Sequence, residues 1–241
     1  MTKAAWFVVG FVLLLALGGA GAFVYYSMYS PDRTAYPLRG IDVSHHQGEI
    51  DWARVAKSDV SFAILKATEG GDYVDDTFAR NLAGARAAGL VVGVYHFFTF
   101  CRPGAEQAKN FLAAVPTDQP MLPPVVDIEF GGNCAARPSV ADFGKQLADF
   151  LKPVEAAFDR PAIIYVMDDV VAQYGTALPD RKRWVRSLVW PPGQRGWVYW
   201  QYHNAGRVDG IPTEVDLNVL GGDAQVLRSL LLPPQRPAAA G

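Results

Sequence analysis

The fold is decided by the stretch LPPVVDIE, residues 122–129, in which an apolar run leads directly into two carboxylates. The run is typical of a buried strand, and the carboxylates stand where that strand ends. Because alternate residues of a strand project to one face, Asp127 and Glu129 should point together while Ile128 faces the opposite packing layer. Two carboxylates in one cleft indicate acid and base chemistry, although an Asp-x-Glu triplet also occurs by chance.

Short apolar runs alternate with helical stretches on both sides of this strand. The predicted strands are residues 39–43, 61–67, 90–97, 125–128, 162–166, 184–189, 196–201 and 214–217. The predicted helices are residues 50–57, 76–88, 105–115, 140–158 with a kink or break at Pro153, and 223–232. Alternating strands and helices predict a parallel sheet, and eight strands suit a closed barrel. The last strands leave no room for full helices, so the barrel should be regular first and irregular later.

The N-terminal segment is too apolar to belong to the barrel. Residues 4–26 carry no charge, and about 20 apolar residues suffice to cross a bilayer. Lys3 precedes them, and the positive-inside tendency then leaves the rest of the chain outside the cytoplasm. Residues 20–22, Ala-Gly-Ala, offer a signal-peptide cleavage site, whereas Tyr25, Tyr26 and Tyr29 suit the aromatic belt of an uncleaved anchor.

The chain therefore divides into four parts. We expect residues 1–30 to be a membrane anchor or signal segment, 31–37 a linker, 38–232 the barrel domain and 233–241 a disordered Pro/Ala tail. The domain has about 200 residues, enough for one large core.

Charge and composition narrow the possible partners. Lys and Arg total 22 against 24 Asp and Glu, without basic runs, and the pI is near 6.1. This balance argues against a nucleic-acid partner. Six Trp and ten Tyr suit either a well-filled core or a surface that stacks on sugar rings.

The two cysteines, Cys101 and Cys134, each follow a predicted strand end. Residues that leave neighbouring parallel strands on the same side come close enough to bridge. We expect a disulfide in an oxidising compartment, the alternative being two free buried thiols. Metal-site spacings such as CxxC or HExxH are absent from the sequence, so no metal site is predicted.

Polar side chains gather at the predicted strand ends, where the chemistry of a β/α barrel collects. They are Asp42, Glu69, Tyr95, His96, Asp127, Glu129, Tyr165, Gln201, Tyr202 and Asp216. Because the first and last strands become neighbours when the barrel closes, Asp42 and Asp216 should approach one another across the seam. With Asp127 and Glu129 they would place four carboxylates at one mouth, and four carboxylates form a site.

All of these residues except Tyr165 lie within stretches that resemble a known family. The matching stretches are GIDVS (40–44) with QGEIDW (47–52), FAILKATEG (62–70), GVYHFF (93–98), LPPVVDIE (122–129), and WQY (200–202) through VDLN (215–218). Spread in order over the whole predicted domain, they resemble glycoside hydrolase family 25, the Chalaropsis-type lysozymes. The resemblance implies an α/β fold, an irregular TIM-type (β/α)5(β)3 barrel. It also implies hydrolysis of the β-1,4 bond between N-acetylmuramic acid and N-acetylglucosamine.

The resemblance assigns roles to the acids. It makes Glu129 the proton donor, with Asp127, Asp42 and Asp216 as its acidic partners. A general acid must keep its proton near neutral pH, which burial or nearby carboxylates achieve by raising its pKa. We expect Asp127 to be ionised and to orient the N-acetyl group of the sugar, the alternative being that it only braces the loop. Strand residues two apart lie roughly 6.5 to 7 Å apart at Cα, which leaves the stereochemistry open. The resemblance favours retention with acetamido participation.

Other residues are candidates for sugar binding. Tyr95, Tyr165, Gln201, Tyr202 and Glu69 are the candidate substrate-binding residues, with core packing the alternative for the tyrosines. His45 and His46 should flank the cleft, and His96 should be a hydrogen-bonded structural residue rather than a proton carrier.

The sequence departs from the family pattern after Trp184. A Trp-Ile-Ala-like strand followed by an aromatic residue is expected there, and Arg186 and Ser187 replace it. Pro191-Pro192-Gly193 also makes a short connection, so the cleft should be more open on that side.

We therefore predict an exported peptidoglycan hydrolase, a lysozyme or 1,4-β-N-acetylmuramidase, that needs no cofactor. Its partners would be peptidoglycan glycan strands and, through the N-terminal segment, a membrane, and the chain should be a monomer. It should lie in the cell envelope, anchored by one transmembrane helix or secreted after cleavage. Two alternatives remain: a chitinase-like hydrolase of N-acetylglucosamine polymers, and a catalytically silent cell-wall-binding protein.

Overall fold

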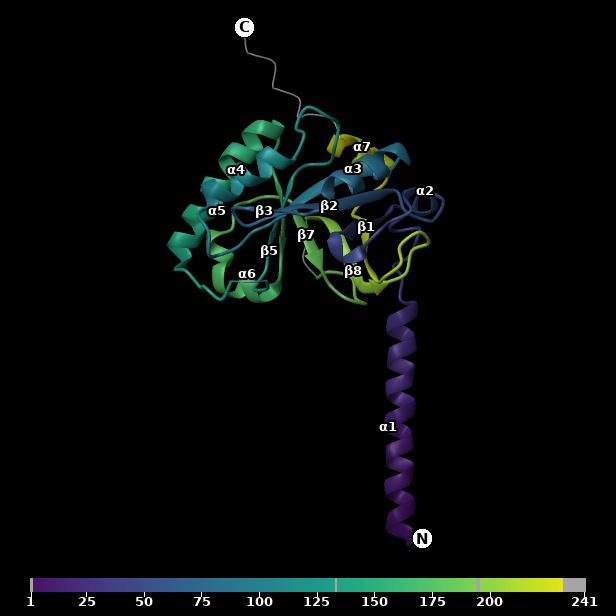
Figure 1. Ribbon diagram of the computed structural model, residues 1–241. Coiled ribbons are helices and arrows are strands. Elements are labelled where there is room, and N and C mark those ends of the chain that lie inside the picture. The colour runs from purple at the N-terminus through teal and green to yellow at the C-terminus, as the bar shows by residue number, and fades with distance from the viewer. Residues whose placement is uncertain (1, 133, 194–195, 232–241) are drawn as a thin grey trace.

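The computed structural model describes residues 2–132, 134–193 and 196–231, which form a barrel with one long helix projecting from it (Figure 1). The strands of the barrel are β1 (Arg39–Val43), β2 (Phe62–Glu69), β4 (Val91–Phe97), β5 (Val125–Ile128), β6 (Ile163–Val166), β7 (Arg183–Arg186), β8 (Trp197–Gly206) and β9 (Val215–Leu220). They include all eight predicted strands.

The strands close in the order β1, β2, β4, β5, β6, β7, β8, β9 and back to β1. Neighbours from β1 to β8 are parallel, whereas β9 runs antiparallel to both β8 and β1. A two-residue strand that the sequence did not predict, β3 (Tyr73–Val74), pairs antiparallel with the end of β2. At the closing seam Asp42 is paired with Asp216, which confirms the predicted approach of the first and last strands.

Helices follow each of the first five barrel strands. They are η1 (His45–Gln47) with α2 (Trp52–Val55), α3 (Phe78–Ala87), α4 (Gly104–Ala114), α5 (Val140–Phe158), and α6 (Asp168–Tyr174) with η2 (Gly175–Ala177). In the described part of the chain no helix separates β7, β8 and β9, and α7 (Ala224–Leu231) follows β9. The fold is the (β/α)5(β)3 barrel that the resemblance implied.

Element boundaries match the predictions best where end signals are strong. Ser139 accepts a hydrogen bond from the backbone N–H of Asp142 at 3.1 Å, and α5 begins there as predicted. The helix continues through Pro153, so the alternative of a break there is wrong. Strand β7 ends at Arg186 rather than at residue 189, and β8 extends five residues beyond the predicted end at residue 201, to Gly206. The predicted tail, 233–241, and residue 232 lie outside the described residues.

The inside of the barrel is filled by large side chains rather than open. Phe62, Ile64, Tyr165, Trp184 and Tyr199 belong to this inner cluster. A Cβ on Gly40 would lie 2.2 Å from the ring of Phe62, so only glycine fits beside that ring. A second apolar layer lies between the first strands and their helices. The polar site is therefore confined to the mouth, above a solid core.

The outer face of the last strands is covered by aromatic residues instead of helices. Trp200 and Tyr202 on β8 pack with Val185 and Val219, and Tyr29, Tyr36 and Trp197 lie against this outer cluster. Tyr29 and Tyr36 belong to the chain that follows α1 (Lys3–Met28), the helix that projects from the barrel in Figure 1. Residues 6–28 of α1 are long and apolar enough to cross a membrane. A signal sequence would meet the same test.

Candidate active site

A polar cleft of about 380 Å³ opens at the mouth of the barrel. Its walls carry all four predicted acids, Asp42, Asp127, Glu129 and Asp216. The other lining residues are Ser44, His46, Lys66, Tyr95, Phe97, Tyr165, Trp184, Arg186, Gln201 and Asn204. Barrel closure thus brings together acids that lie up to 174 residues apart in the chain, the difference between positions 216 and 42.

Two buried amides hold the carboxylate of Asp42. Asn218 Nδ2 donates to Asp42 Oδ2 at 2.6 Å, and Gln201 Nε2 donates to the same oxygen at 3.2 Å. Both amides are oriented in turn by aromatic side chains. The indole N–H of Trp184 donates to Asn218 Oδ1 at 2.8 Å, and the hydroxyl of Tyr165 donates to Gln201 Oε1 at 3.2 Å. The position of Asp42 is therefore fixed before substrate arrives.

Asp42 and Asp216 share a proton across the seam. Burial raises the pKa of Asp216 to about 9, and repulsion by Asp42 adds to the rise. Burial also raises the pKa of Asp42, to about 6, against the hydrogen bonds of Asn218 and Gln201, which lower it. Near neutral pH, Asp216 is thus the protonated partner and Asp42 the charged one.

Asp127 and Glu129 differ in their surroundings, and the difference bears on our expectation of an ionised Asp127. Burial, and then repulsion by Glu129, raises the pKa of Asp127 well above its ordinary range. Its Oδ1 is buried and has no hydrogen-bond partner among the described residues. Burial also raises the pKa of Glu129, but the positive charge of Arg186 opposes the rise. In the empty cleft a proton on Asp127 is therefore favoured, because two close buried carboxylates do not both ionise.

Two cations line the same cleft, and only one of them is paired within the described residues. Lys66 is buried and donates from Nζ to Glu69 Oε2 at 2.6 Å, with its ammonium 5.0 Å from the centre of the Phe97 ring. Arg186, the last residue of β7, is half-buried, and its Nη1 lies 3.9 Å from Met167 Sδ. In the residues that the structure describes, Arg186 belongs to no ion pair.

The predicted binding residues divide into three groups. Tyr95, Tyr165 and Gln201 line the cleft. Glu69 lines an adjoining hollow with His45 and Tyr73, and reaches the cleft only through its ion pair with Lys66. Tyr202 does not join the site, because Gln201 points inward on β8 and its neighbour must then point outward, where Tyr202 packs on Tyr29.

The histidines near the mouth differ in their surroundings. His96 is buried, 2.7 Å from Thr68 Oγ1 and 3.1 Å from Gln107 Oε1, and burial lowers its pKa to about 3. It is therefore a neutral structural residue, in agreement with the sequence analysis. His46 lines the cleft, and His45 lies in the adjoining hollow.

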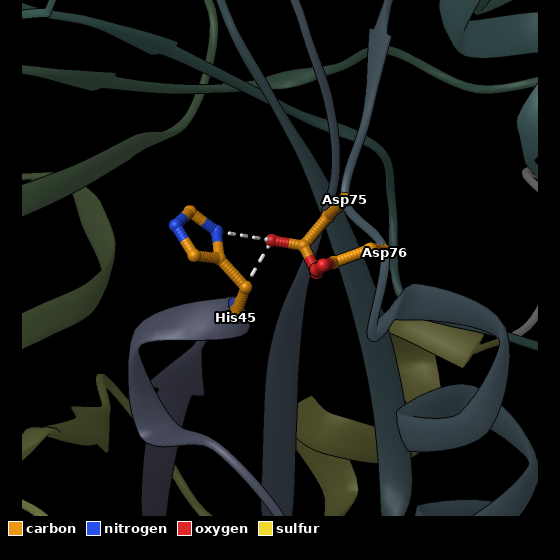
Figure 2. A group of neighbouring side chains, drawn as sticks. All are labelled: His45, Asp75 and Asp76. Atoms are coloured by element: carbon orange, nitrogen blue, oxygen red, sulfur yellow. Dashed lines mark hydrogen bonds and ion pairs between the residues drawn. The ribbon is translucent and has the colours of Figure 1, made fainter.

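His45 also belongs to a group with Asp75 and Asp76 whose ligand atoms all lie within 4.8 Å of one another (Figure 2). The bonds of Asp75 explain this group without an ion. Its Oδ2 accepts from the backbone N–H of His45 at 2.9 Å and lies 3.1 Å from His45 Nδ1. Its Oδ1 accepts from the backbone and the hydroxyl of Thr77 at 3.0 and 2.6 Å. The carboxylate joins η1 to the start of α3, and the absence of a metal site remains a prediction.

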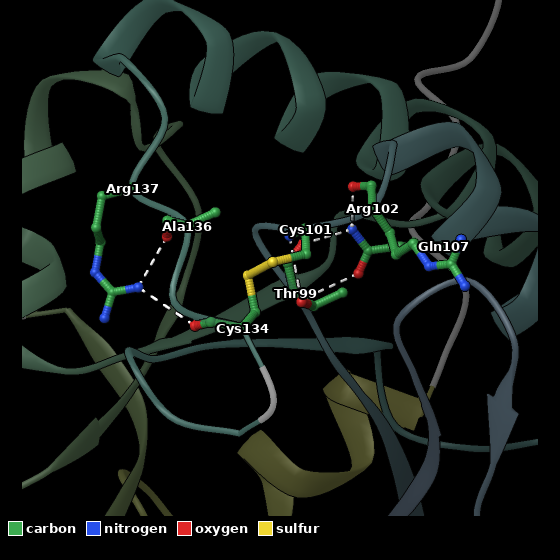
Figure 3. The surroundings of a disulfide bond; sticks show 7 residues. All are labelled: Thr99, Cys101, Arg102, Gln107, Cys134, Ala136 and Arg137. Carbon is green, nitrogen blue, oxygen red and sulfur yellow. Dashed lines mark hydrogen bonds between the residues drawn. A yellow bond between two sulfur atoms is a disulfide. The ribbon is translucent and has the colours of Figure 1, made fainter.

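The predicted disulfide between Cys101 and Cys134 is present, with their Cα atoms 5.8 Å apart (Figure 3). It joins the loop after β4 to the loop after β5, directly beyond Glu129. Arg137 donates to the carbonyl of Ala136 at 2.8 Å, and its guanidinium lies 4.1 Å from the centre of the Phe130 ring. The loop that follows the two acids is thus held at several points.

Sequence reasoning missed Trp184, Asn218, Lys66 and Arg186 as members of the site. A signal was available for Asn218, which stands two residues after Asp216 and so shares its strand face. The same rule applies to Trp184 and Arg186 on β7. Lys66 and Glu69 are three apart at a register shift in β2, and no local pattern predicts their pairing.

Comparison with known proteins places these features in a family. Residues 41–211 match the model of Glycosyl hydrolases family 25. Lysozyme M1 of Streptomyces globisporus is 34% identical over 212 residues, which cover 80% of this chain and 71% of that protein.

Solved structures are similar as well. A family 25 glycosyl hydrolase from Bacillus anthracis superposes with a TM-score of 0.78 at 33% identity, over 85% of this chain and 97% of that one. The bacterial lysozyme from Streptomyces coelicolor gives a TM-score of 0.72 at 33% identity, over 80% and 96% of the two chains.

Proposed function

The chain belongs to glycosyl hydrolase family 25, and from that premise we propose that it is a peptidoglycan hydrolase, a 1,4-β-N-acetylmuramidase. It would cleave the bond between N-acetylmuramic acid and N-acetylglucosamine. The observation that carries the proposal is the cluster of four carboxyls, Asp42, Asp127, Glu129 and Asp216, in one cleft with aromatic walls. The similarity to Lysozyme M1 supports the same substrate.

Glu129 is the proposed general acid. A glycosidic oxygen is a poor leaving group, so a carboxylic acid must protonate it as the bond breaks. Glu129 is more exposed to the cleft than Asp127, so it can reach a substrate oxygen, while burial raises its pKa toward the neutral range.

Asp127 is proposed to receive the acetamido group of the sugar. Its unpartnered Oδ1 is an acceptor without a donor among the described residues, and the acetamido N–H would supply one. A hydrogen bond from that group favours the ionised form of Asp127. The new negative charge would then raise the pKa of Glu129, so substrate binding would itself put the proton on the acid.

The bond changes follow from these roles. Glu129 gives its proton to the glycosidic oxygen, the bond to the anomeric carbon breaks, and the N-acetylglucosamine side leaves as an alcohol. The acetamido oxygen attacks the anomeric carbon to form an oxazolinium ring. Water then attacks the same carbon from the vacated side and gives a proton to the Glu129 carboxylate, so the configuration is retained. The charged Asp42, fixed by Asn218 and Gln201, would stabilise the positive centre.

We also propose that the enzyme acts as a monomer outside the cytoplasm and that α1 stays attached as a membrane anchor. The contacts that support an attached anchor are those of the last turns of α1. The hydroxyl of Tyr26 donates to Asn204, and His203 Nε2 lies 3.0 Å from the carbonyl oxygen of Tyr26. The intact mass of the protein recovered from washed membranes tests this: cleavage after Ala22 would leave a chain that begins at Phe23.

The function is tested with the full chain in mild detergent beside Glu129→Gln, on purified peptidoglycan and on chitin. The substitution keeps the size of the side chain but removes the proton that it gives, so hydrolysis should fall by at least about 10²-fold. Muramic-acid reducing ends from the wild type alone would support the proposal. Activity on chitin alone would favour a chitinase instead, and equal activity of the variant would refute the role of Glu129.

A further inference from the structure

Arg186 is a cation in the catalytic cleft that has no ion-pair partner in the described part of the chain. It ends β7 and lines the cleft, where the family resemblance leads one to expect a small side chain. Its only hydrogen-bond partner among the described residues is the thioether of Met167, 3.9 Å from Nη1. A thioether is a weak acceptor, so nearly all of the five N–H donors of the guanidinium remain available.

Lys66, the other cation that lines the cleft, is paired, so the lack of an ion-pair partner is not a general property of cations in this cleft. Lys66 is buried and is neutralised by Glu69 at 2.6 Å, so it has little charge left for a ligand. Arg186 is half-buried, and its side chain is open to the cleft without being open to bulk water on all sides. A charge in such a position attracts a ligand more strongly than one on an open surface.

Arg186 also acts on the acids of the cleft, and its positive charge favours the charged form of Asp42 that the proposed mechanism uses. Its positive charge opposes the rise in the pKa of Glu129, and the proposed acid needs that rise to hold its proton. It likewise opposes the raised pKa values of Asp42 and Asp216. A substrate anion bound to Arg186 would reduce its effect on Glu129 and so help the acid to hold its proton.

The glycan offers one anion that fits. Muramic acid differs from glucosamine by a lactyl ether, whose carboxyl is a free carboxylate when the stem peptide has been removed and a neutral amide when it is attached. A planar guanidinium binds a carboxylate through two parallel N–H···O bonds, and it binds an amide oxygen more weakly.

We propose that Arg186 forms an anion subsite for the lactyl carboxylate of peptide-free muramic acid, which makes stripped glycan strands the preferred substrate. The inference rests on the proposed muramidase function and adds the form of the glycan that it cleaves. A reaction that hydrolyses the amide between the lactyl group and the stem peptide must then precede this enzyme.

The test compares three forms of one glycan with the full chain in mild detergent. The first is peptide-free with its lactyl carboxylates intact, the second is the same material with these carboxyls converted to primary amides, and the third still carries its peptides. Reducing ends give kcat and KM, each at the pH optimum of the protein variant. The wild type should favour the first form over the second by about 10- to 100-fold in kcat/KM, as for a hydrogen bond to a charged group.

Three variants make the result specific. The quantity compared is the ratio of kcat/KM on the first form to kcat/KM on the second. Arg186→Gln should bring this ratio close to one, through a higher KM for the first form, and Arg186→Lys should keep part of the preference. Arg207→Gln is the matched control, because it removes one positive charge from an exposed ion pair with Glu214 that does not line the cleft. It should leave the ratio unchanged.

Three outcomes would overturn the subsite. They are equal wild-type efficiency on the first two forms, a ratio that Arg186→Gln does not alter, and a preference for the peptide-carrying form. If the wild type cleaves none of the three, the muramidase function itself has failed. That result is distinct from a muramidase without charge preference.

Discussion

The two halves of the barrel are stabilised in different ways. From β1 to β6 each barrel strand is followed by a helix, and one continuous apolar layer lies between those strands and their helices. From β7 to β9 the strands have no helices between them in the described residues, and aromatic side chains from the chain after α1 cover them. The helix-free half therefore depends on a segment that is far away in sequence.

The halves also contribute different chemistry. The helical half supplies Asp127, on β5, and Glu129, at the start of the loop that the disulfide holds. The helix-free half supplies the amides of Gln201 and Asn218, which orient Asp42, and it supplies Arg186. The first half holds the acid, and the second determines how the cleft is arranged around it.

The largest effect should come from truncating the aromatic cover. Trp200 is fully buried, its indole N–H donates to Ser187 O at 2.7 Å, and its ring meets Tyr36 edge-on at 5.5 Å. Trp200→Ala should lower the free energy of unfolding by about 3–5 kcal/mol, and Phe143→Ala under the helices of the other half by a similar amount. The measurement is denaturant unfolding of the full chain in mild detergent.

Adding Tyr36→Ala to Trp200→Ala and to Phe143→Ala tests whether the chain after α1 stabilises the helix-free half and not the helical half. It should couple with Trp200→Ala by about 0.5–1.5 kcal/mol, as aromatic pairs do, and add independently to Phe143→Ala. Additivity in both backgrounds would mean that the linker does not stabilise the helix-free half.

A smaller effect is expected from two buried asparagines, one in each half. Asn218 accepts from Trp184 and donates to Asp42, while Asn81 accepts from Trp52 at 3.3 Å and donates to Thr77 at 3.0 Å. Asn218→Ala and Asn81→Ala should each cost about 1–3 kcal/mol of stability, because each leaves buried partners unsatisfied.

Only the first should impair catalysis, since only Asn218 contacts one of the acids. We expect kcat/KM on peptidoglycan to fall by about tenfold or more for Asn218→Ala, as a lost hydrogen bond to a charged group implies, and to stay near the wild-type value for Asn81→Ala. Equal losses in both would show that stability, not the orientation of Asp42, limits activity.

A further effect is a change in how stability depends on pH. Asp216 has a folded pKa of about 9 against an ordinary value of 3.8, so the folded protein binds more protons than the unfolded chain between these limits. Stability should therefore decrease as pH rises from about 4 to about 9. Asp216→Asn stays neutral throughout, so its Tm should fall less over pH 6–9, by about 2–4 °C for each kcal/mol removed. Parallel Tm curves would contradict the proton assignment.

Much of the helical half could be predicted from sequence because its signals are local. The residues of β5 and α5 match their predicted ranges, and the seam between Asp42 and Asp216 followed from closure of eight strands. The sequence could not place Tyr202, since the inward or outward direction of a strand residue depends on register. It could not predict the raised pKa of Asp127, since this depends on burial and on distant charges.

The contact between the end of α1 and the cleft has a consequence for where catalysis can occur. Asn204 lines the cleft and bonds to Tyr26, so in a chain that keeps its anchor the cleft lies beside the point where α1 leaves the membrane. Such an enzyme diffuses in two dimensions and reaches only the innermost layer of the wall. Its activity would depend on the gap between membrane and wall, and widening that gap by osmotic shrinkage of the cell would switch it off without any change in the protein.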